Sequence, residues 1–158
     1  MRLQLAAAML AMTTCLGCST TYDNRLLETE YKDPGKLYFV ENHGKDKRHL
    51  DQVIAEELRA RWLSARSGLA ADRPGNFDVL VTYEDRWWWD MGNYLIFLRI
   101  DFREPVSNAL LAMGHSYQTS LVRKASEVVV SHVIARVMGE PLPVPKTQDK
   151  SGIRSEQF

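Results

Sequence analysis

The chain has 158 residues, and its 20 lysines and arginines balance its 20 aspartates and glutamates, so its formal net charge is zero. Without a basic excess, a nucleic-acid partner is not expected. The length suits one domain, because domains most often run to about 100–200 residues.

The first 17 residues predict a secretory signal peptide. Arg2 supplies a positive charge, residues 5–12 (LAAAMLAM) form an apolar core, and Thr13 opens a stretch of small and polar residues. A helix that spans a membrane needs about 20 mostly apolar residues. Since the apolar run stops at Thr13, we expect residues 1–17 to be removed rather than to anchor the chain.

Residues 15–18 (CLGC) resemble the lipobox of bacterial lipoproteins, although that motif usually begins with leucine where this chain has Cys15. The resemblance implies cleavage after Gly17 and lipid on Cys18, and Ser19 after the cysteine implies sorting to the periplasmic face of the outer membrane. Cys18 would be the only cysteine of the mature chain, so it has no disulfide partner there. Its acyl chains would bind the membrane firmly, at about 0.8 kcal/mol per buried methylene. The alternative is an ordinary secreted protein with an unmodified thiol.

Polar segments flank the part of the chain that can build a core. Residues 18–36 are polar and end in a Pro34-Gly35 turn, which predicts a flexible lipidated tether. Residues 140–158 begin with alternating prolines and have little to bury, which predicts a disordered tail. The globular domain is therefore expected at residues 37–139, which is enough for one modest core.

Within residues 37–139, the spacing of apolar residues changes several times. Residues 37–40 (LYFV) predict a first strand. From Leu50, apolar residues recur at i+3, i+4 and i+8, which predicts an amphipathic helix from Asp46 to near Trp62. A loop that contains two glycines and a proline is expected next.

Three β-prone segments follow, at residues 77–83, 94–102 and 109–118, and the turn residues between them indicate an antiparallel meander. Residues 125–138 have helical spacing, although their valines are weak helix formers and leave a strand as the alternative. The prediction is an α+β domain with an antiparallel sheet of four to five strands packed by two helices, in the order β-α-(β)-β-β-β-α.

This order behind a lipobox, with the stretch DVLVTYEDRWWWDMGNYL at residues 78–95, resembles a family of small Gram-negative outer-membrane lipoproteins of unknown function. The resemblance covers roughly residues 38–138. The fold it implies is similar to envelope-export domains: the curli-secretion lipoprotein, exopolysaccharide-export ring lipoproteins and the amino-terminal domain of the Tol periplasmic protein. Because those domains make protein contacts, the resemblance implies a non-catalytic binding or assembly module, with the usual limit that a shared fold fixes function poorly.

Three of the four tryptophans follow one another between two predicted strands. Successive strand side chains point to opposite faces, so at least one indole should be exposed. The cluster could pack over a sheet end, bind a protein, or meet a membrane interface or a sugar. Tryptophan and arginine are frequent in protein hot spots, and flanking carboxylates disfavour anionic lipid. The predicted partner-binding residues are Arg86, Trp87, Trp88, Trp89 and Asp90, for an envelope protein or self-association, with a carbohydrate or envelope polymer as the alternative.

Catalytic and metal motifs are weak. Residues 114–118 (GHSYQ) begin like a nucleophile elbow but lack its last glycine and lie mid-strand. His43 and His49 around Asp46 read as a solvated loop, and His132 reads as a core residue. Nothing brings Glu84, Asp85, Asp90 and Asp101 together around a substrate. We therefore expect no enzyme, no metal and no cofactor.

Overall fold

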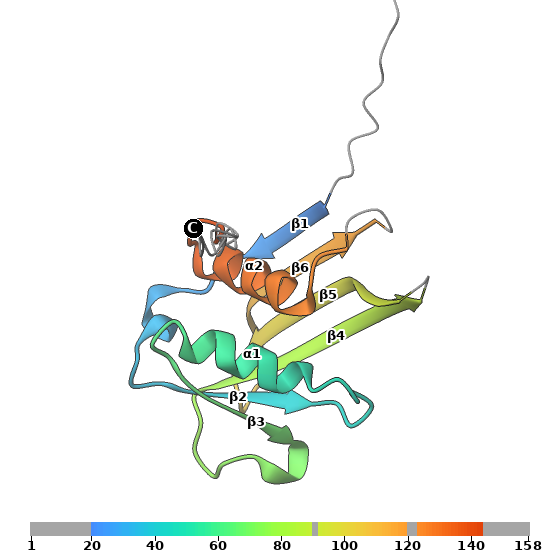
Figure 1. The fold of residues 1–158 in the computed structure, drawn as a ribbon. Helices are drawn as coiled ribbons and strands as arrows, with labels where there is room; N and C mark the ends of the chain where they lie inside the picture. The colour runs from blue at the N-terminus through green and yellow to red at the C-terminus, as the bar shows by residue number, and fades with distance from the viewer. Residues whose placement is uncertain (1–19, 90–91, 120–122, 144–158) are drawn as a thin grey trace, which may run out of the picture.

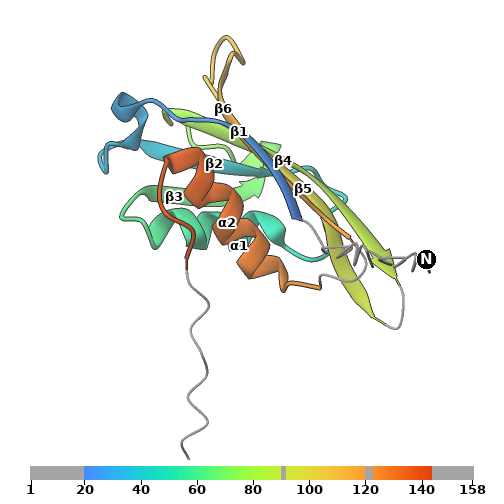
Figure 2. The same cartoon turned by 90° about the horizontal axis from the view of Figure 1, so that it is seen from above.

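The computed structural model describes residues 20–89, 92–119 and 123–143. These residues form a six-stranded sheet with both α-helices packed on one of its faces (Figure 1, Figure 2). The strands are β1 (Thr20–Arg25), β2 (Leu37–Asn42), β3 (Ser64–Leu69), β4 (Val79–Trp89), β5 (Asn93–Arg103) and β6 (Leu110–Gln118). The helices are α1 (Leu50–Arg59) and α2 (Ser126–Met138), with short 3-10 turns η1 (Thr29–Lys32) and η2 (Ala70–Asp72).

The strand order across the sheet is β1-β6-β5-β4-β2-β3. β4, β5 and β6 form the predicted antiparallel meander, and β1 pairs antiparallel with β6. β2 runs parallel to both of its neighbours, β3 and β4. The α+β class with two helices is confirmed, but the sheet is mixed and has six strands, whereas the sequence predicts four to five antiparallel ones. The parallel pair β2–β3 arises because α1 carries the chain back across the sheet between these strands.

The two edge strands lie where the sequence pattern gives little signal. β1 falls inside the predicted tether, residues 18–36, and belongs to the sheet. Leu27 is also buried, and its N–H donates to the carbonyl of Val137 at 2.9 Å. β3 takes the place of the bracketed strand, in a segment predicted as a loop. Both strands are polar and pair at a sheet edge through main-chain groups, so neither has a clear apolar alternation.

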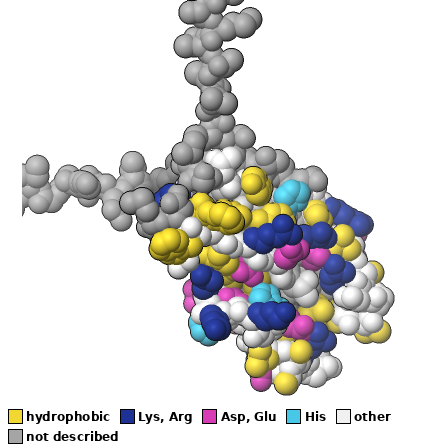
Figure 3. Space-filling view, turned by 90° about the vertical axis from the view of Figure 1, so that its right-hand side faces the viewer, with side chains coloured by type: hydrophobic (Ala, Val, Ile, Leu, Met, Phe, Trp, Pro, Cys, Tyr) yellow, Lys and Arg dark blue, Asp and Glu magenta, His cyan; other side chains and the backbone are white. Residues whose placement is uncertain are grey.

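The hairpin of β4 and β5 extends beyond the layer of helices (Figure 1, Figure 2). Figure 3 views the molecule from the side on which this hairpin ends. Hydrophobic side chains lie there among both basic and acidic ones. This end of the sheet carries the tryptophan cluster.

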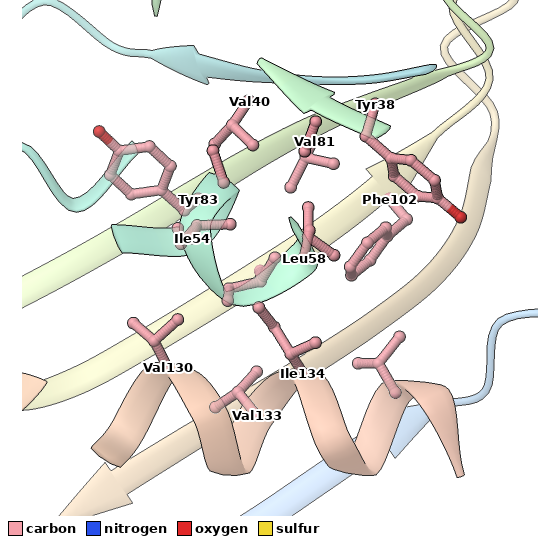
Figure 4. Close-up of a cluster of buried hydrophobic side chains, with 14 of the residues drawn as sticks. Tyr38, Val40, Ile54, Leu58, Val81, Tyr83, Phe102, Val130, Val133 and Ile134 are labelled. Carbon is pink, nitrogen blue, oxygen red and sulfur yellow. The ribbon is translucent and has the colours of Figure 1, made fainter. Parts of the chain in front are cut away.

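The core fills the space between the sheet and the two helices (Figure 4). α2 is a helix as predicted, because its valines are buried against the sheet and this burial outweighs their low propensity. It ends at Gly139, whose φ of 70° is the left-handed conformation that glycine adopts most easily. The labelled core side chains come from three strands and both helices: Tyr38, Val40, Ile54, Leu58, Val81, Tyr83, Phe102, Val130, Val133 and Ile134.

α1 begins at Leu50, four residues later than predicted. The cause is the carboxylate of Asp46, which accepts hydrogen bonds from the N–H of Arg48 at 2.7 Å and of Leu50 at 2.6 Å. Side chains that bond nearby main-chain N–H groups favour a turn over a helix. Residues 46–49 therefore form a turn that leads into α1.

Candidate functional site

The tryptophan cluster occupies the last three residues of β4. The side chain of Trp88 is 58% exposed and that of Trp89 is 72% exposed, which confirms the expectation of at least one exposed indole. Trp88 pairs with Tyr94 and Trp89 pairs with Asn93 across the hairpin. Of the other predicted site residues, Asp90 and Cys18 lie outside the described residues.

Trp87 differs from the other two indoles because it is half-buried and packs against the core. Trp87 and Asp85 lie on the helix-covered side of β4, while Arg86 and Trp88 point to the opposite side, as strand alternation requires. The pairing register shifts between Arg86 and Trp87, which leaves Ile96 of β5 as an extra residue. Such a bulge re-aims the side chains next to it.

The loop between β2 and α1 holds the Trp87 indole in place. The indole Nε1 donates to Asp85 at 2.6 Å, and the other carboxylate oxygen of Asp85 lies 3.0 Å from Nε2 of His43. The guanidinium of Arg48 lies 4.3 Å from the centroid of the indole ring, in cation–π contact. Since Nδ1 of His43 accepts a hydrogen bond from the N–H of Lys45, the proton is assigned to Nε2, which donates to Asp85. Through these contacts, Trp87 joins the β4–β5 hairpin to the loop before α1.

Arg86 belongs to a separate group on the open face of the sheet. It donates to the carboxylate of Glu84 at 2.9 Å, and its guanidinium lies 5.1 Å from the centroid of Phe97. The predicted site residues therefore do not form one cluster. Trp87 contacts the loop before α1, whereas Arg86 and Trp88 face the other side.

A depression of about 450 Å³ lies beside Trp88. Its wall includes Tyr94 and Tyr117, and Tyr117 is 49% exposed. Its base includes the buried Gln118, whose side-chain amide donates to the carbonyl of Leu95 at 2.7 Å. Three of the six residues that line this depression are therefore aromatic.

The described chain begins at this same end. Thr20, the first residue of β1, pairs with Gln118 at the end of β6. Figure 1 and Figure 2 both show the start of β1 on the side toward which the β4–β5 hairpin extends. The first described residue and the two exposed indoles therefore lie at the same end of the sheet.

A network of polar groups joins the start of α1 to β4. The hydroxyl of Tyr83 donates to the carboxylate of Asp46 at 2.8 Å. Burial alone would raise the pKa of Asp46, but the hydrogen bonds from Tyr83 and from the N–H groups of Arg48 and Leu50 outweigh it, so the pKa is lowered. The pKa of Tyr83 is raised by burial and by the same carboxylate.

The structure places two of the carboxylates that the sequence left as a possible catalytic group together, because Glu84 and Asp101 line the same depression on the open face of the sheet. Asp90 lies outside the described residues. Asp85 is bound to Trp87 and His43 on the helix side, while Asp101 lies on the open face between Arg99 and Arg103, at 2.7 and 2.6 Å. Among residues 20–89, 92–119 and 123–143, no three or more His, Cys, Asp or Glu side chains are grouped closely enough to hold a metal ion.

Two other sequence predictions concern single residues. Ser116 lies within β6 and is buried, as its predicted mid-strand position indicates. His132 is buried in α2, and burial and the nearby Lys124 lower its pKa. In the described part of the chain, every helix is too short or too polar to span a bilayer.

The fold is also found in solved structures. A PelC dodecamer from Paraburkholderia phytofirmans aligns with a TM-score of 0.56 and 16% identity, over 76% of this chain and 95% of the PelC chain. A leucine-to-methionine variant of the same protein, also a dodecamer, aligns with a TM-score of 0.59 and 13% identity, over 76% and 98%. No protein-family model and no curated protein matches the chain. At these identities the likeness establishes the fold alone.

Proposed function

We propose that the protein is a non-catalytic assembly module of the cell envelope, held by lipid on Cys18 to the periplasmic face of the outer membrane, where it binds further copies of itself. The observation that carries this proposal is that β1 begins at the same end of the sheet as the exposed Trp88 and Trp89 (Figure 1). That end faces the membrane in the proposed arrangement.

The charges around the indoles are compatible with this orientation. The sequence alone disfavours contact with anionic lipid, because Glu84, Asp85 and Asp90 flank the cluster. Asp90 lies outside the described residues. In the structure, Glu84 is paired with Arg86, and Asp85 is bound by His43 and Trp87. Tryptophan is also enriched at membrane–water interfaces, where its ring meets the apolar layer and its N–H meets water.

Support for self-association comes from the fold. The two PelC structures described above are dodecamers, and this chain covers at least 95% of each PelC chain. Copies arranged head-to-tail close into a ring when the rotation between neighbours allows it. The sequence resemblance to envelope-export lipoproteins points to the same kind of role.

Lipid attachment is tested by expressing the full chain in a Gram-negative host with radiolabelled palmitate. We expect label on the protein and its recovery with the outer membrane, and we expect Cys18→Ala to lose both. Cys15→Ala is the matched control, because Cys15 leaves with the signal peptide. Label that persists in Cys18→Ala contradicts the anchor.

Self-association is tested on the mature lipoprotein extracted in mild detergent. Native mass spectrometry is expected to give an oligomer of defined copy number, and crosslinking in cells should give a ladder of the same protein. A monomer at all concentrations, with no ladder in cells, overturns the assembly role without touching the lipid anchor.

A further inference from the structure

The fourth tryptophan, Trp62, lies in the turn after α1, three positions beyond Arg59, and is 85% exposed. Its backbone has a φ of 64°, in the left-handed region that favours glycine or asparagine at the end of a helix. A bulky residue is strained there, and its exposed ring gains little from burial. Folding therefore does not explain an indole at this position, which points to a contact with something outside the domain.

Trp62 borders a depression of about 600 Å³, within the range of about 300–1,000 Å³ that is typical of ligand sites. Arg59 and Arg66 line the same depression, and Leu37 and Ser64 contribute to its base. The guanidinium of Arg59 donates to the carbonyl of Ala65, another residue of the lining, at 2.9 Å.

The charge of this depression is one-sided. Its lining includes two guanidinium groups and no carboxylate, although the whole chain has zero net charge. Arg61, Arg73 and Arg103 each form an ion pair with a carboxylate. No such pair forms at Arg59 or Arg66 within the part of the chain that the structure describes. The site therefore has positive charge available for an anion.

We propose that this depression binds an acidic polysaccharide, through a carboxylated pyranose unit. The flat indole of Trp62 would stack on the apolar face of the sugar ring. Arg59 and Arg66 would donate to the carboxylate, since the planar guanidinium matches carboxylate geometry. The hydroxyl of Ser64 and nearby main-chain groups would meet the sugar hydroxyls.

The surroundings of Trp62 favour a glycan over a protein. A protein hot spot lies at the centre of a packed patch whose neighbours exclude water. Here the indole is bordered by two arginines and by Leu37, Leu63 and Ala65, of which Leu63 and Ala65 are buried, so Trp62 is the exposed apolar group of the lining. The depression opens at the β3 edge of the sheet, where a polymer can pass.

This site is also remote from the tryptophan cluster. Leu37 and Ser64 are the first residues of β2 and β3, and β2 runs parallel to β4, which ends at Trp89. Figure 1 shows α1 ending on the side of the molecule opposite the β4–β5 hairpin. The glycan site therefore lies away from the proposed membrane end.

The test is calorimetric titration of the purified full chain with polygalacturonate and alginate oligosaccharides. Neutral dextran oligosaccharides and polyglutamate, which has carboxylates but no sugar ring, are the comparison ligands. We expect saturable binding of the two acidic glycans, at least tenfold tighter than of either comparison ligand. Failure to bind either acidic glycan, or equal binding of polyglutamate, overturns the proposal.

Variants assign the binding to the depression. Trp62→Gly is expected to keep or raise the melting temperature, because glycine suits the left-handed backbone, and to weaken glycan binding at least tenfold. Arg66→Gln should also weaken it, while Trp89→Ala is the matched control and should leave it unchanged. Glycan binding that survives Trp62→Gly overturns the site. If Trp62→Gly loses self-association but keeps glycan binding, Trp62 belongs to a protein contact instead.

Discussion

Asp46 shows how one side chain positions the loop that supports the tryptophan cluster. Its carboxylate accepts hydrogen bonds from the N–H groups of Arg48 and Leu50 and from the hydroxyl of Tyr83. The first two bonds set the turn before α1, and the third joins that turn to β4. Arg48, which packs on the Trp87 indole, lies within the same turn.

We predict that Asp46→Ala lowers the free energy of unfolding at pH 7 by about 1–3 kcal/mol, because it removes the charged acceptor of three hydrogen bonds. The pKa of Asp46 is lowered in the fold, so its stabilisation is present above the unfolded value of about 3.9 and is lost as the pH falls through the folded value. Urea unfolding from pH 7 to pH 2 should show the wild type and the variant converging in acid. Lys47→Ala, in the same loop, is the control, and a difference that stays constant with pH contradicts the role of the ionised carboxylate.

At the scale of elements, the contact between α2 and the sheet depends on Gly114 of β6. A Cβ atom at this position would lie 2.6 Å from Cγ2 of Val137 and 3.1 Å from Cγ1 of Val133. α2 therefore approaches β6 more closely than any side chain on Gly114 would allow. This close contact also fixes the helix over the strand that pairs with β1.

We predict that Gly114→Ala lowers the free energy of unfolding by about 1–3 kcal/mol, because the added methyl group overpacks the helix–sheet contact. Removing the opposing methyl groups with Val137→Ala should make the double variant more stable than the sum of the single effects predicts. Gly75→Ala is the control, since a Cβ there has no neighbour within 4 Å. If guanidinium unfolding shows that the two changes in unfolding free energy are strictly additive, the methyl group added at residue 114 does not overpack against Val137.

The sequence predicts those elements that bury a periodic apolar face. α1, α2 and the three meander strands were identifiable for this reason. β1 and β3 were not, because they are polar edge strands whose pairing depends on main-chain groups and on the arrangement of distant segments. The parallel direction of β2 and β3 also cannot be read from local spacing.

The same distinction holds for the site. Exposure of at least one indole follows from strand alternation at Trp87, Trp88 and Trp89. The support of Trp87 by His43, through Asp85, cannot be predicted from strand alternation. His43 lies 42 positions before Asp85, and only the sheet topology brings the two side chains together. In the sequence, Trp62 marked only the expected end of a helix. Its left-handed backbone, which is more typical of glycine, is a feature of the structure.

At the scale of the whole molecule, the exposed indoles divide between two ends. Trp88 and Trp89 lie at the end of the sheet at which β1 begins, whereas Trp62 lies at the end where β2 and β3 start. A short link from Cys18 to Thr20 would allow the first end to rest on the membrane. The second end would then face the periplasm, where soluble polymers can reach it.

This orientation predicts a difference in how closely the indoles approach lipid. With the mature lipoprotein reconstituted in vesicles that contain brominated phospholipid, we expect part of the tryptophan fluorescence to be quenched. Replacing both Trp88 and Trp89 with phenylalanine should remove most of that quenching, because these two rings would lie in the interface. Trp62→Phe should leave the quenched intensity unchanged, since the ring is held at the far end of a rigid sheet. Quenching that is lost with Trp62→Phe and kept in the double variant would reverse the orientation and place the hairpin in the periplasm.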